Sequence, residues 1–458
     1  MKKLFFIVSI FIVIGLALPL VGNKVINEEI QNRLDVLTSY GVKVEDTKVD
    51  SSYLVTSRHY EFKVVDSDKF ITYISQFSEA QLPPYTKSLL DGIRVGTDLK
   101  YSNFPFKDAM SIDIYPLSLS TPISKEIAKQ DKDFLSFLTK IFKTKGFLYH
   151  LNYAVIDTHF DGYIKDFDES FRFKDGVEIK MAFNGSTFSG LGPILAPTSN
   201  KMKISNIVIS SKDKLKQTTL SISDITLNSN FSSASTYSYD FYIGGFNLKN
   251  DGIYSKGIFD LSNFKLFVSS DTTTADAHIS SKISFENLDV KSKTEFVNLQ
   301  NFNYDISLDK LKKDSYKEIR TLLMKSKLSK TKKLDVKLEK ALVDIIANGL
   351  EFKISDFSVK KISYLTFKNI DGFSVKTDFS IKKDLDFINK YKKNKDYILK
   401  NIDIKTTLKL SKDMFNALTK VAPMSVMAKG FAKEDGTNLV FDFSFVKGEL
   451  LLNGKKLR

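Results

Sequence analysis

The sequence predicts a mainly β protein with helical inserts (α+β), in which an N-terminal transmembrane helix precedes an extended, curved antiparallel β-sheet body with β-bulged repeat units. Three observations predict this fold. The run Leu4 to Gly22 carries no charge. Apolar and polar residues alternate over most of residues 147–308, as in half-buried strands. An eight-residue pattern with Asn or Asp at its fifth position recurs through the chain.

The N-terminal run reads LFFIVSIFIVIGLALPLVG and follows Lys2 and Lys3. A helix through it would be about 28 Å long, close to the ~30 Å hydrocarbon core of a bilayer. The basic flank favours a cytoplasmic N-terminus, and the rest of the chain is then exported across the membrane. The alternative is a cleaved secretory signal. The pattern favours an uncleaved single-pass membrane anchor, because the run exceeds the usual 7–15 apolar residues and lacks an Ala-x-Ala site.

Composition excludes several classes of site and partner. The chain has 458 residues, more than one ordinary compact domain needs. It contains no Cys, which excludes disulfides, thiolate metal sites and a Cys nucleophile. The net charge of +14 is spread among acidic residues, so a solvated surface facing anionic lipid is expected rather than nucleic-acid binding.

The sequence predicts four regions along the chain. Residues 1–24 form the cytoplasmic tip and the anchor, and residues 25–41 form an amphipathic stem helix that ends at Gly41. Residues 42–310 form a β-rich periplasmic region. Residues 311–458 form a C-terminal α+β region. The boundary near residue 310 is placed where helical periodicity replaces alternation.

Within these regions, helices are expected where apolar residues recur at helical spacing. One or two short helices are predicted in residues 67–91, and longer ones at Asp131–Lys143, Asp314–Lys327, Asp335–Asn348 and after Ser411. Strands are expected at Val42–Val44, Tyr60–Val64 and Leu439–Phe445, and a final strand runs from Glu449 to Leu452 before the Asn453-Gly454 turn.

The recurring octet is apolar-x-apolar-x-Asn/Asp-apolar-x-apolar. It occurs as MKISNIVI from Met202, LSISDITL from Leu220, FDLSNFKL from Phe259, ISFENLDV from Ile283, VNLQNFNY from Val297, FKISDFSV from Phe352 and YILKNIDI from Tyr397. The apolar positions change parity at the Asn or Asp, so an unbroken strand would send them to opposite faces. Asn and Asp tolerate the left-handed region, and a bulge there would return every apolar side chain to one face.

A shared apolar face predicts a groove for a hydrophobic, lipid-like ligand. The candidate groove residues flank the Asn or Asp of five octets: Ile204, Ile207, Ile222, Ile225, Leu261, Phe264, Phe285, Leu288, Ile354 and Phe357.

Several segments resemble the YdgA-like family of bacterial envelope proteins, which is defined as a domain of unknown function. They are the anchor with Gly22-Asn23-Lys24, the segment Tyr53 to His59, Asn103-Phe104-Pro105-Phe106, and the terminus from Gly430-Phe431 through Lys447 to Lys455. The resemblance implies an inner-membrane anchor and a periplasmic body, and it implies no catalytic residues. The strand-kink-strand units are more distantly similar to AsmA-type proteins, whose curled sheets form apolar grooves associated with lipid.

No catalytic, cofactor-binding or metal-ligating residues are predicted, and no cofactor is expected. The four histidines (His59, His150, His159 and His278) lack the spacing of a helical zinc motif. His150 and His159 with Asp157 and Asp161 could form a metal site, but surface or core histidines are expected there. The acid pairs Asp166/Asp168 and Asp384/Asp386 lack a recognisable cleft.

Three functions therefore stay open. The favoured one is a non-enzymatic, membrane-anchored envelope protein that binds a hydrophobic ligand or an envelope partner along the apolar groove. The second is a structural module that self-associates through strand edges. The third is a periplasmic hydrolase whose residues converge only in three dimensions.

Overall fold

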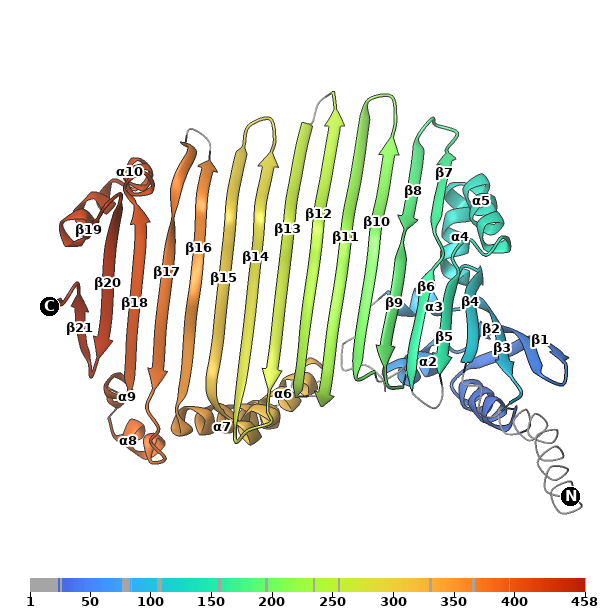
Figure 1. The fold of residues 1–458 in the computed structure, drawn as a ribbon, viewed down its shortest axis with the longest axis horizontal. Coiled ribbons are helices and arrows are strands. Elements are labelled where there is room, and N and C mark those ends of the chain that lie inside the picture. The colour runs from blue at the N-terminus through green and yellow to red at the C-terminus, as the bar shows by residue number, and fades with distance from the viewer. Residues whose placement is uncertain are drawn as a thin grey trace, which may run out of the picture. The chain divides into compact units, whose positions relative to one another are not determined.

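The computed structural model describes residue 24 and residues 27–75, 83, 85–104, 109–154, 158–193, 197–233, 235–253, 256–328, 332–364, 367–394 and 396–457. The expected anchor, Leu4 to Gly22, lies outside these residues. Among the described helices, none combines the length and apolar character needed to cross a membrane. The described part of the chain is mainly β, with 22 strands in antiparallel pairing and several helices (Figure 1).

The chain divides into two compact units at Lys214/Leu215. The boundary expected near residue 310 falls inside the second unit, within the last residues of a strand that ends at Lys312. The stem helix covers residues 27–39 and stops at Gly41, whose φ of 81° is left-handed, as the sequence indicated.

In the part of the first unit that the structure describes, there are ten strands and four helices besides the stem. The strands are β1 (Val42–Ser51), β2 (Val55–Val64), β3 (Arg94–Ser102), β4 (Ala109–Ser118), β5 (Tyr149–Ala154), β6 (His159–Ile164), β7 (Phe167–Arg172), β8 (Glu178–Asn184), β9 (Ser186–Leu191) and β10 (Ser199–Lys212). The helices are α2 (Ser67–Ser75), α3 (Thr86–Leu90), α4 (Thr121–Gln130) and α5 (Lys132–Lys143).

Strands β1 to β6 pair with their sequence neighbours, and β6 then pairs with β9. Strand β10 pairs with β9 and then with β8, past a bend at Gly185, whose φ is 64°. One face of this sheet forms a small core of Leu151, Phe160 and Phe188. Helix α5 begins where the Asp131 carboxylate accepts hydrogen bonds from the Asp133 and Phe134 amides, which confirms the helix expected at Asp131–Lys143.

The second unit is a long antiparallel meander with helices at its connections. Its long strands are β11 (Lys216–Ser233), β12 (Thr236–Gly252), β13 (Lys256–Asp271), β14 (Asp276–Lys291), β15 (Phe296–Lys312), β16 (Leu350–Tyr364) and β17 (Phe367–Ile381). Shorter strands complete it: β18 (Ile402–Ser411), β19 (Lys433–Asp435), β20 (Asn438–Val446), β21 (Glu449–Leu452) and β22 (Lys455–Lys456). Each of β11 to β17 pairs with the next strand in sequence, and β18 then pairs with β20.

Helices occupy the two ends of this second sheet. The helices α6 (Lys313–Leu328) and α7 (Lys332–Asn348) lie between β15 and β16, as the sequence predicted, and Gly349 ends α7 with a φ of 81°. Next to them, α8 (Phe387–Lys393) and α9 (Tyr397–Asn401) connect β17 to β18. At the opposite end, α10 (Lys412–Val421) and the 3₁₀ segment η1 (Pro423–Phe431) follow β18 (Figure 1).

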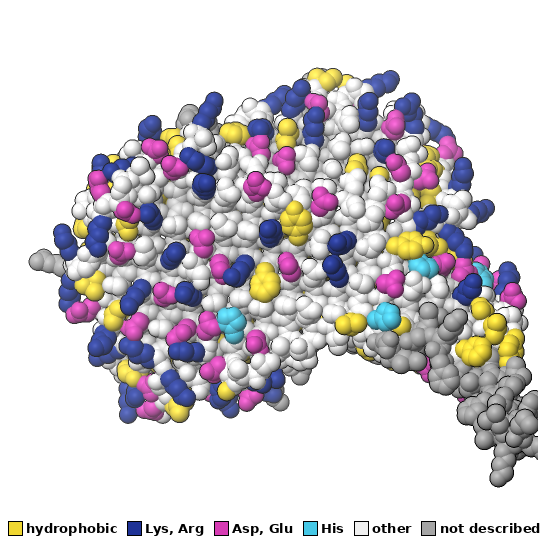
Figure 2. Space-filling view, viewed as in Figure 1, with side chains coloured by type: hydrophobic (Ala, Val, Ile, Leu, Met, Phe, Trp, Pro, Cys, Tyr) yellow, Lys and Arg dark blue, Asp and Glu magenta, His cyan; other side chains and the backbone are white. Residues whose placement is uncertain are grey.

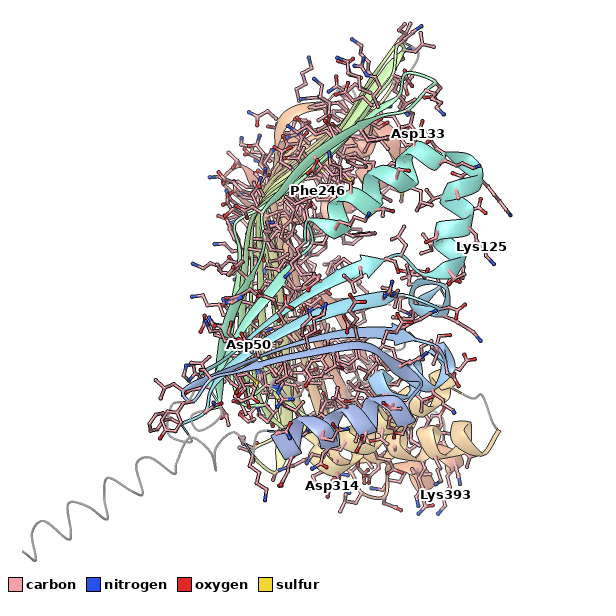
Figure 3. All side chains as sticks on the ribbon, turned by 90° about the vertical axis from the view of Figure 1, so that its right-hand side faces the viewer. Asp50, Lys125, Asp133, Phe246, Asp314 and Lys393 are labelled. Carbon is pink, nitrogen blue, oxygen red and sulfur yellow. The ribbon has the colours of Figure 1, made fainter. Side chains whose placement is uncertain are left out.

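The long strands bend at the octet positions that the sequence singled out. Asp224, Asn263 and Asn301 have φ values of 54°, 53° and 52° and lie in β11, β13 and β15. Each is skipped in the ladder together with one residue of the neighbouring strand. For example, Ser262 pairs with Gly245 and Phe264 pairs with Ile243, while Asn263 and Gly244 are left out. Phe246, which is labelled in Figure 3, lies on β12 close to the positions at which these strands bend. The left-handed residue therefore changes the parity of the strand, as predicted.

In β12 and β17, glycine residues permit the bend. Gly244 of β12 faces Asp224, and a Cβ at residue 244 would lie 2.8 Å from the Asp224 Cβ. A Cβ at Gly372 of β17 would lie 2.1 Å from the Val359 carbonyl oxygen. At these two positions glycine permits the close approach of neighbouring backbones. Asp356 has no left-handed φ, and the register of β16 shifts between Ile354 and Phe357 instead.

One octet was wrongly interpreted. Tyr397-Ile-Leu-Lys-Asn401 forms the helix α9, and β18 begins only at Ile402. The first half of this octet does not alternate, and Asp396 starts a single helical turn there. The Asn206 and Asn287 octets lie in strands, but neither residue has a left-handed φ. In the first case the left-handed residue is Gly185, which lies opposite β10.

Candidate functional site

Cross-strand pairing collects the apolar residues of the second unit into rows on one face of the sheet. On one side of the bend, a row runs across β11 to β16 through Ile222, Phe246, Leu261, Leu288, Leu299 and Ile362. On the other side, a row runs from β11 to β20 through Leu227, Phe241, Leu266, Ile283, Tyr304, Phe357, Val375, Leu408 and Phe441. Directly paired residues share a face, so these rows form one continuous apolar surface. We call it the apolar face.

Aromatic rings fill the middle of the apolar face. Phe285 and Phe302 stack with ring centroids 4.7 Å apart and an angle of 3° between the planes. Phe357 meets Phe302 edge-on at 6.1 Å and Phe373 edge-on at 5.3 Å. The four rings therefore form a chain across β14, β15, β16 and β17.

The opposite face of the same strands is polar. Lys265 of β13 pairs with Tyr242 and Ser284, and Lys282 of β14 lies 3.0 Å from Asp305 of β15. Figure 2 shows basic and acidic side chains interspersed over the face that it presents. An antiparallel sheet with one polar and one apolar face normally covers the apolar one.

Helices cover the apolar face at its two ends. At one end, Ile345 of α7 packs on Ala277 and Leu311, and Tyr316 and Ile319 of α6 join this cluster. At the other end, Phe415 of α10 packs on Leu410, Leu439 and Phe441. Between these clusters the side chains of the apolar face are mostly half-buried. Tyr239 and Leu248 of β12 are exposed, by 36% and 39%. An apolar surface of this extent is typical of a site that binds a partner.

The structure brings eight of the ten predicted groove residues onto the apolar face. Ile222, Ile225, Leu261, Phe264, Phe285, Leu288, Ile354 and Phe357 are all half-buried there. Ile204 and Ile207 belong to the first unit, where Ile204 is buried and Ile207 pairs with Phe183. The sequence reasoning missed Phe241, Ile243 and Phe246 of β12, because Gly244-Gly245 stands where the octet has Asn or Asp. A parity change around paired glycines would have found them.

The histidines expected as surface or core residues lie apart. His150 of β5 contacts the Asp113 carboxylate with Nδ1 at 2.6 Å and stacks on the ring of Tyr163. His159 pairs with Ala154, about 13 Å along the strand from the position opposite His150. Asp157 lies outside the described residues. His278 is bonded to Asp309 in the second unit.

The two acid pairs have structural partners. Asp166 accepts a hydrogen bond from the Gly185 amide, and Asp168 lies 3.4 Å from Lys180. Asp384 accepts hydrogen bonds from Tyr397 and Lys390, which hold the pKa of its carboxyl below the ordinary value. These carboxylates stabilise a strand bend and the α8–α9 connection.

A comparison with protein families assigns most of the chain to one family. The family model described as bacterial protein of unknown function (DUF945) matches residues 125–458, which run from α4 to the C-terminus and include the whole second unit. Searches among curated proteins and among solved structures returned no match. The match covers well over half of the chain, and the protein therefore belongs to the DUF945 family of bacterial proteins of unknown function.

Proposed function

We propose that this protein binds a hydrophobic, lipid-like ligand along the apolar face of its second unit and does so without catalysing a reaction. The observation that carries the proposal is the cross-strand alignment of half-buried Ile, Leu and Phe side chains over β11 to β18. An acyl chain would gain about 0.8 kcal/mol for each CH₂ group that it buries there.

The form of the apolar face favours an extended ligand over a compact one. Its rows run from strand to strand, and the chain of rings from Phe285 to Phe373 lies near its middle. The hydroxyls of Thr377 and Thr406, 3.1 Å apart, add a polar point among apolar neighbours. Such a surface suits acyl chains, which need apolar contact along their length and few hydrogen bonds.

We also propose that the chain is tethered in the bacterial inner membrane, with its N-terminus cytoplasmic and its bulk periplasmic. Support comes from the uncharged run Leu4 to Gly22 behind Lys2 and Lys3. The resemblances to YdgA-like envelope proteins and to AsmA-type grooves fit this location and this ligand class. An envelope protein in place of a lipid is the alternative occupant of the apolar face.

Extraction of bound lipid tests the proposal. Full-length protein is purified in detergent, washed, and extracted with organic solvent, and the extract is analysed by mass spectrometry. We expect an acyl lipid in stoichiometric amount. The double variant Phe264→Asp/Phe285→Asp should lose most of it, because charge on the apolar face opposes burial of an acyl chain.

The control places two aspartates on the polar face instead. Lys265→Asp/Ser284→Asp changes the residues that pair with each other on the opposite side of β13 and β14, and this variant should retain the lipid. Extracts that contain no lipid above the detergent blank, or equal lipid in both double variants, would refute a lipid-binding role.

A further inference from the structure

A row of charged and polar residues crosses the strands of the first unit. Direct pairing aligns one residue from each of the strands β1 to β6: Lys48, His59, Asp98, Asp113, His150 and Tyr163. Two histidines in this row have the same contact, an Nδ1 atom 2.6 Å from an aspartate oxygen. They differ in what surrounds the other ring nitrogen.

Asp98 fixes the orientation of the His59 ring. Its Oδ1 is 2.6 Å from His59 Nδ1, and its Oδ2 is 2.5 Å from the Lys145 ammonium. Partial burial opposes ionisation of Asp98, but Lys145 and His59 together hold the pKa of its carboxyl below the ordinary value. The ionised carboxylate accepts the Nδ1 proton, so the Nε2 lone pair of a neutral His59 points to the other side of the ring.

Glu61 lies on that other side, and Asp46 lies near both residues. His59 Nε2 is 3.8 Å from Glu61 Oε1, too far for a hydrogen bond. Ligand atoms of His59, Glu61 and Asp46 all lie within 4.8 Å of one another. A neutral imidazole nitrogen and a carboxylate oxygen are both acceptors, so either a proton or a metal ion between them removes their repulsion.

We propose that His59 Nε2, Glu61 and Asp46 bind a divalent transition-metal ion of the Zn²⁺ class. Tetrahedral Zn²⁺ with ligands at ~2.1 Å places them about 3.4 Å apart, so side-chain shifts of about 1 Å complete the site. One imidazole with two carboxylates is a ligand set that such ions accept. Asp98 would be the outer carboxylate that orients the ligating histidine.

Neighbouring basic side chains contact the Glu61 and Asp46 carboxylates. Arg94 lies 2.7 Å from Glu61 Oε2 and 2.7 Å from Glu45 Oε2, which leaves Glu61 Oε1 directed toward His59. The Lys48 side chain is 75% exposed and 3.3 Å from Asp46, so a metal ion can displace it into solvent.

The site is open to further ligands. A hollow of about 400 Å³ borders His59 and is lined by Lys48, Asp50, Ser57, Asp98, Lys100, Ser111 and Asp113 among others. Asp50 is labelled in Figure 3, toward the end of β1. The Asp46 side chain is 41% exposed, so solvent water can reach the three ligands and complete the coordination. All three ligating residues precede residue 125, outside the part of the chain that matches the family model.

Metal titration of the full-length protein tests the site. Protein without an affinity tag, purified in detergent and treated with EDTA, is titrated with Zn²⁺ by calorimetry and with Co²⁺ by visible absorption. We expect one saturable site. His59→Gln should abolish it, and Asp98→Asn should weaken it by about 10- to 100-fold.

His150→Gln is the matched control, since His150 has the same aspartate contact and should leave binding unchanged. Circular dichroism checks that each variant folds. Absence of saturable Zn²⁺ binding, binding that survives in His59→Gln, or binding lost equally in His150→Gln would overturn the proposal. A Co²⁺ spectrum that His59→Gln leaves unaltered would do the same.

Discussion

Single residues decide on which side of the second sheet the apolar side chains lie. Asp224, Asn263 and Asn301 adopt a conformation that costs other L-residues roughly 1–2 kcal/mol, and Asn and Asp tolerate it better. If residue 263 continued the strand, Phe264 would face the opposite side from Leu261. Because this backbone preference is local, the sequence could predict the left-handed residues from their position in the octet.

Substitution of Asp224 tests this claim. Asp224 is exposed, so a change of its side chain mainly alters the cost of its φ of 54°. Asp224→Gly should keep the stability of the protein, and Asp224→Val should lower the free energy of unfolding by about 1–2 kcal/mol. Urea unfolding followed by circular dichroism measures the difference. Equal stability of the two variants would show that no left-handed residue is needed.

The lowered pKa of Asp98 predicts that the stability of the protein depends on pH. The pKa of Asp98 is lowered from 3.8. The stabilisation of the folded protein by the ionised Asp98 is therefore complete above pH 3.8, and it is lost as the pH falls through the lowered pKa. The pKa of Lys145 is raised from 10.5 by Asp98, so that contribution is full below pH 10.5 and is lost at higher pH. The stability difference between the wild type and Asp98→Asn should therefore shrink as the pH falls below 3.8.

Thermal unfolding across this pH range measures that difference. Lys145→Met removes the partner of the same carboxylate and should show the same decline toward acid. If the stability difference between the wild type and Asp98→Asn instead widened below pH 3.8, the pH dependence would have the opposite sign. That result would contradict a lowered pKa of Asp98.

At the scale of elements, capping residues determine where helices begin and end. Asp131, Ser411 and Gly349 are short-range signals, and the helices that they bound were predicted from the sequence. Helix α4 was missed because Pro122 and scattered apolar residues give weak periodicity. Helix α9 was mistaken for a strand because its five residues are too few to show a helical period.

The N-cap of α10 gives a prediction for one element. The Ser411 hydroxyl accepts a hydrogen bond from the Met414 amide at 2.9 Å and donates one to the Asp371 carbonyl. Ser411→Ala should destabilise the protein by about 1–2 kcal/mol, because the helix loses its N-cap and two partly buried hydrogen bonds are lost. Ser425→Ala, which removes an exposed bond to the Ala422 carbonyl, should change stability by less than ~0.5 kcal/mol. Chemical denaturation compares them, and equal effects would refute a capping role.

At the scale of the whole molecule, pairing between distant strands creates surfaces that no local pattern contains. The octets predicted an apolar face for the strands that contain them, but not which residues of neighbouring strands lie opposite. The bend at Gly244 and Gly372 follows the bends of adjacent strands, so it depends on register. The cluster of Asp46, His59 and Glu61 likewise needs β1 and β2 paired and β3 beside them. Sequence spacing alone therefore did not predict it.

The central claim is that the apolar face contacts lipid and the opposite face does not. The chain contains no Trp, so one substitution adds a single fluorescent reporter. Phe264→Trp places it on the apolar face, and Phe267→Trp places it on the polar face of the same strand, between Asp240 and Lys282. We predict that phosphatidylcholine with dibrominated acyl chains, added to the full-length variants, strongly quenches the reporter at position 264 and hardly quenches the one at position 267. Equal quenching in the two variants, or none in Phe264→Trp, would contradict a lipid-binding face.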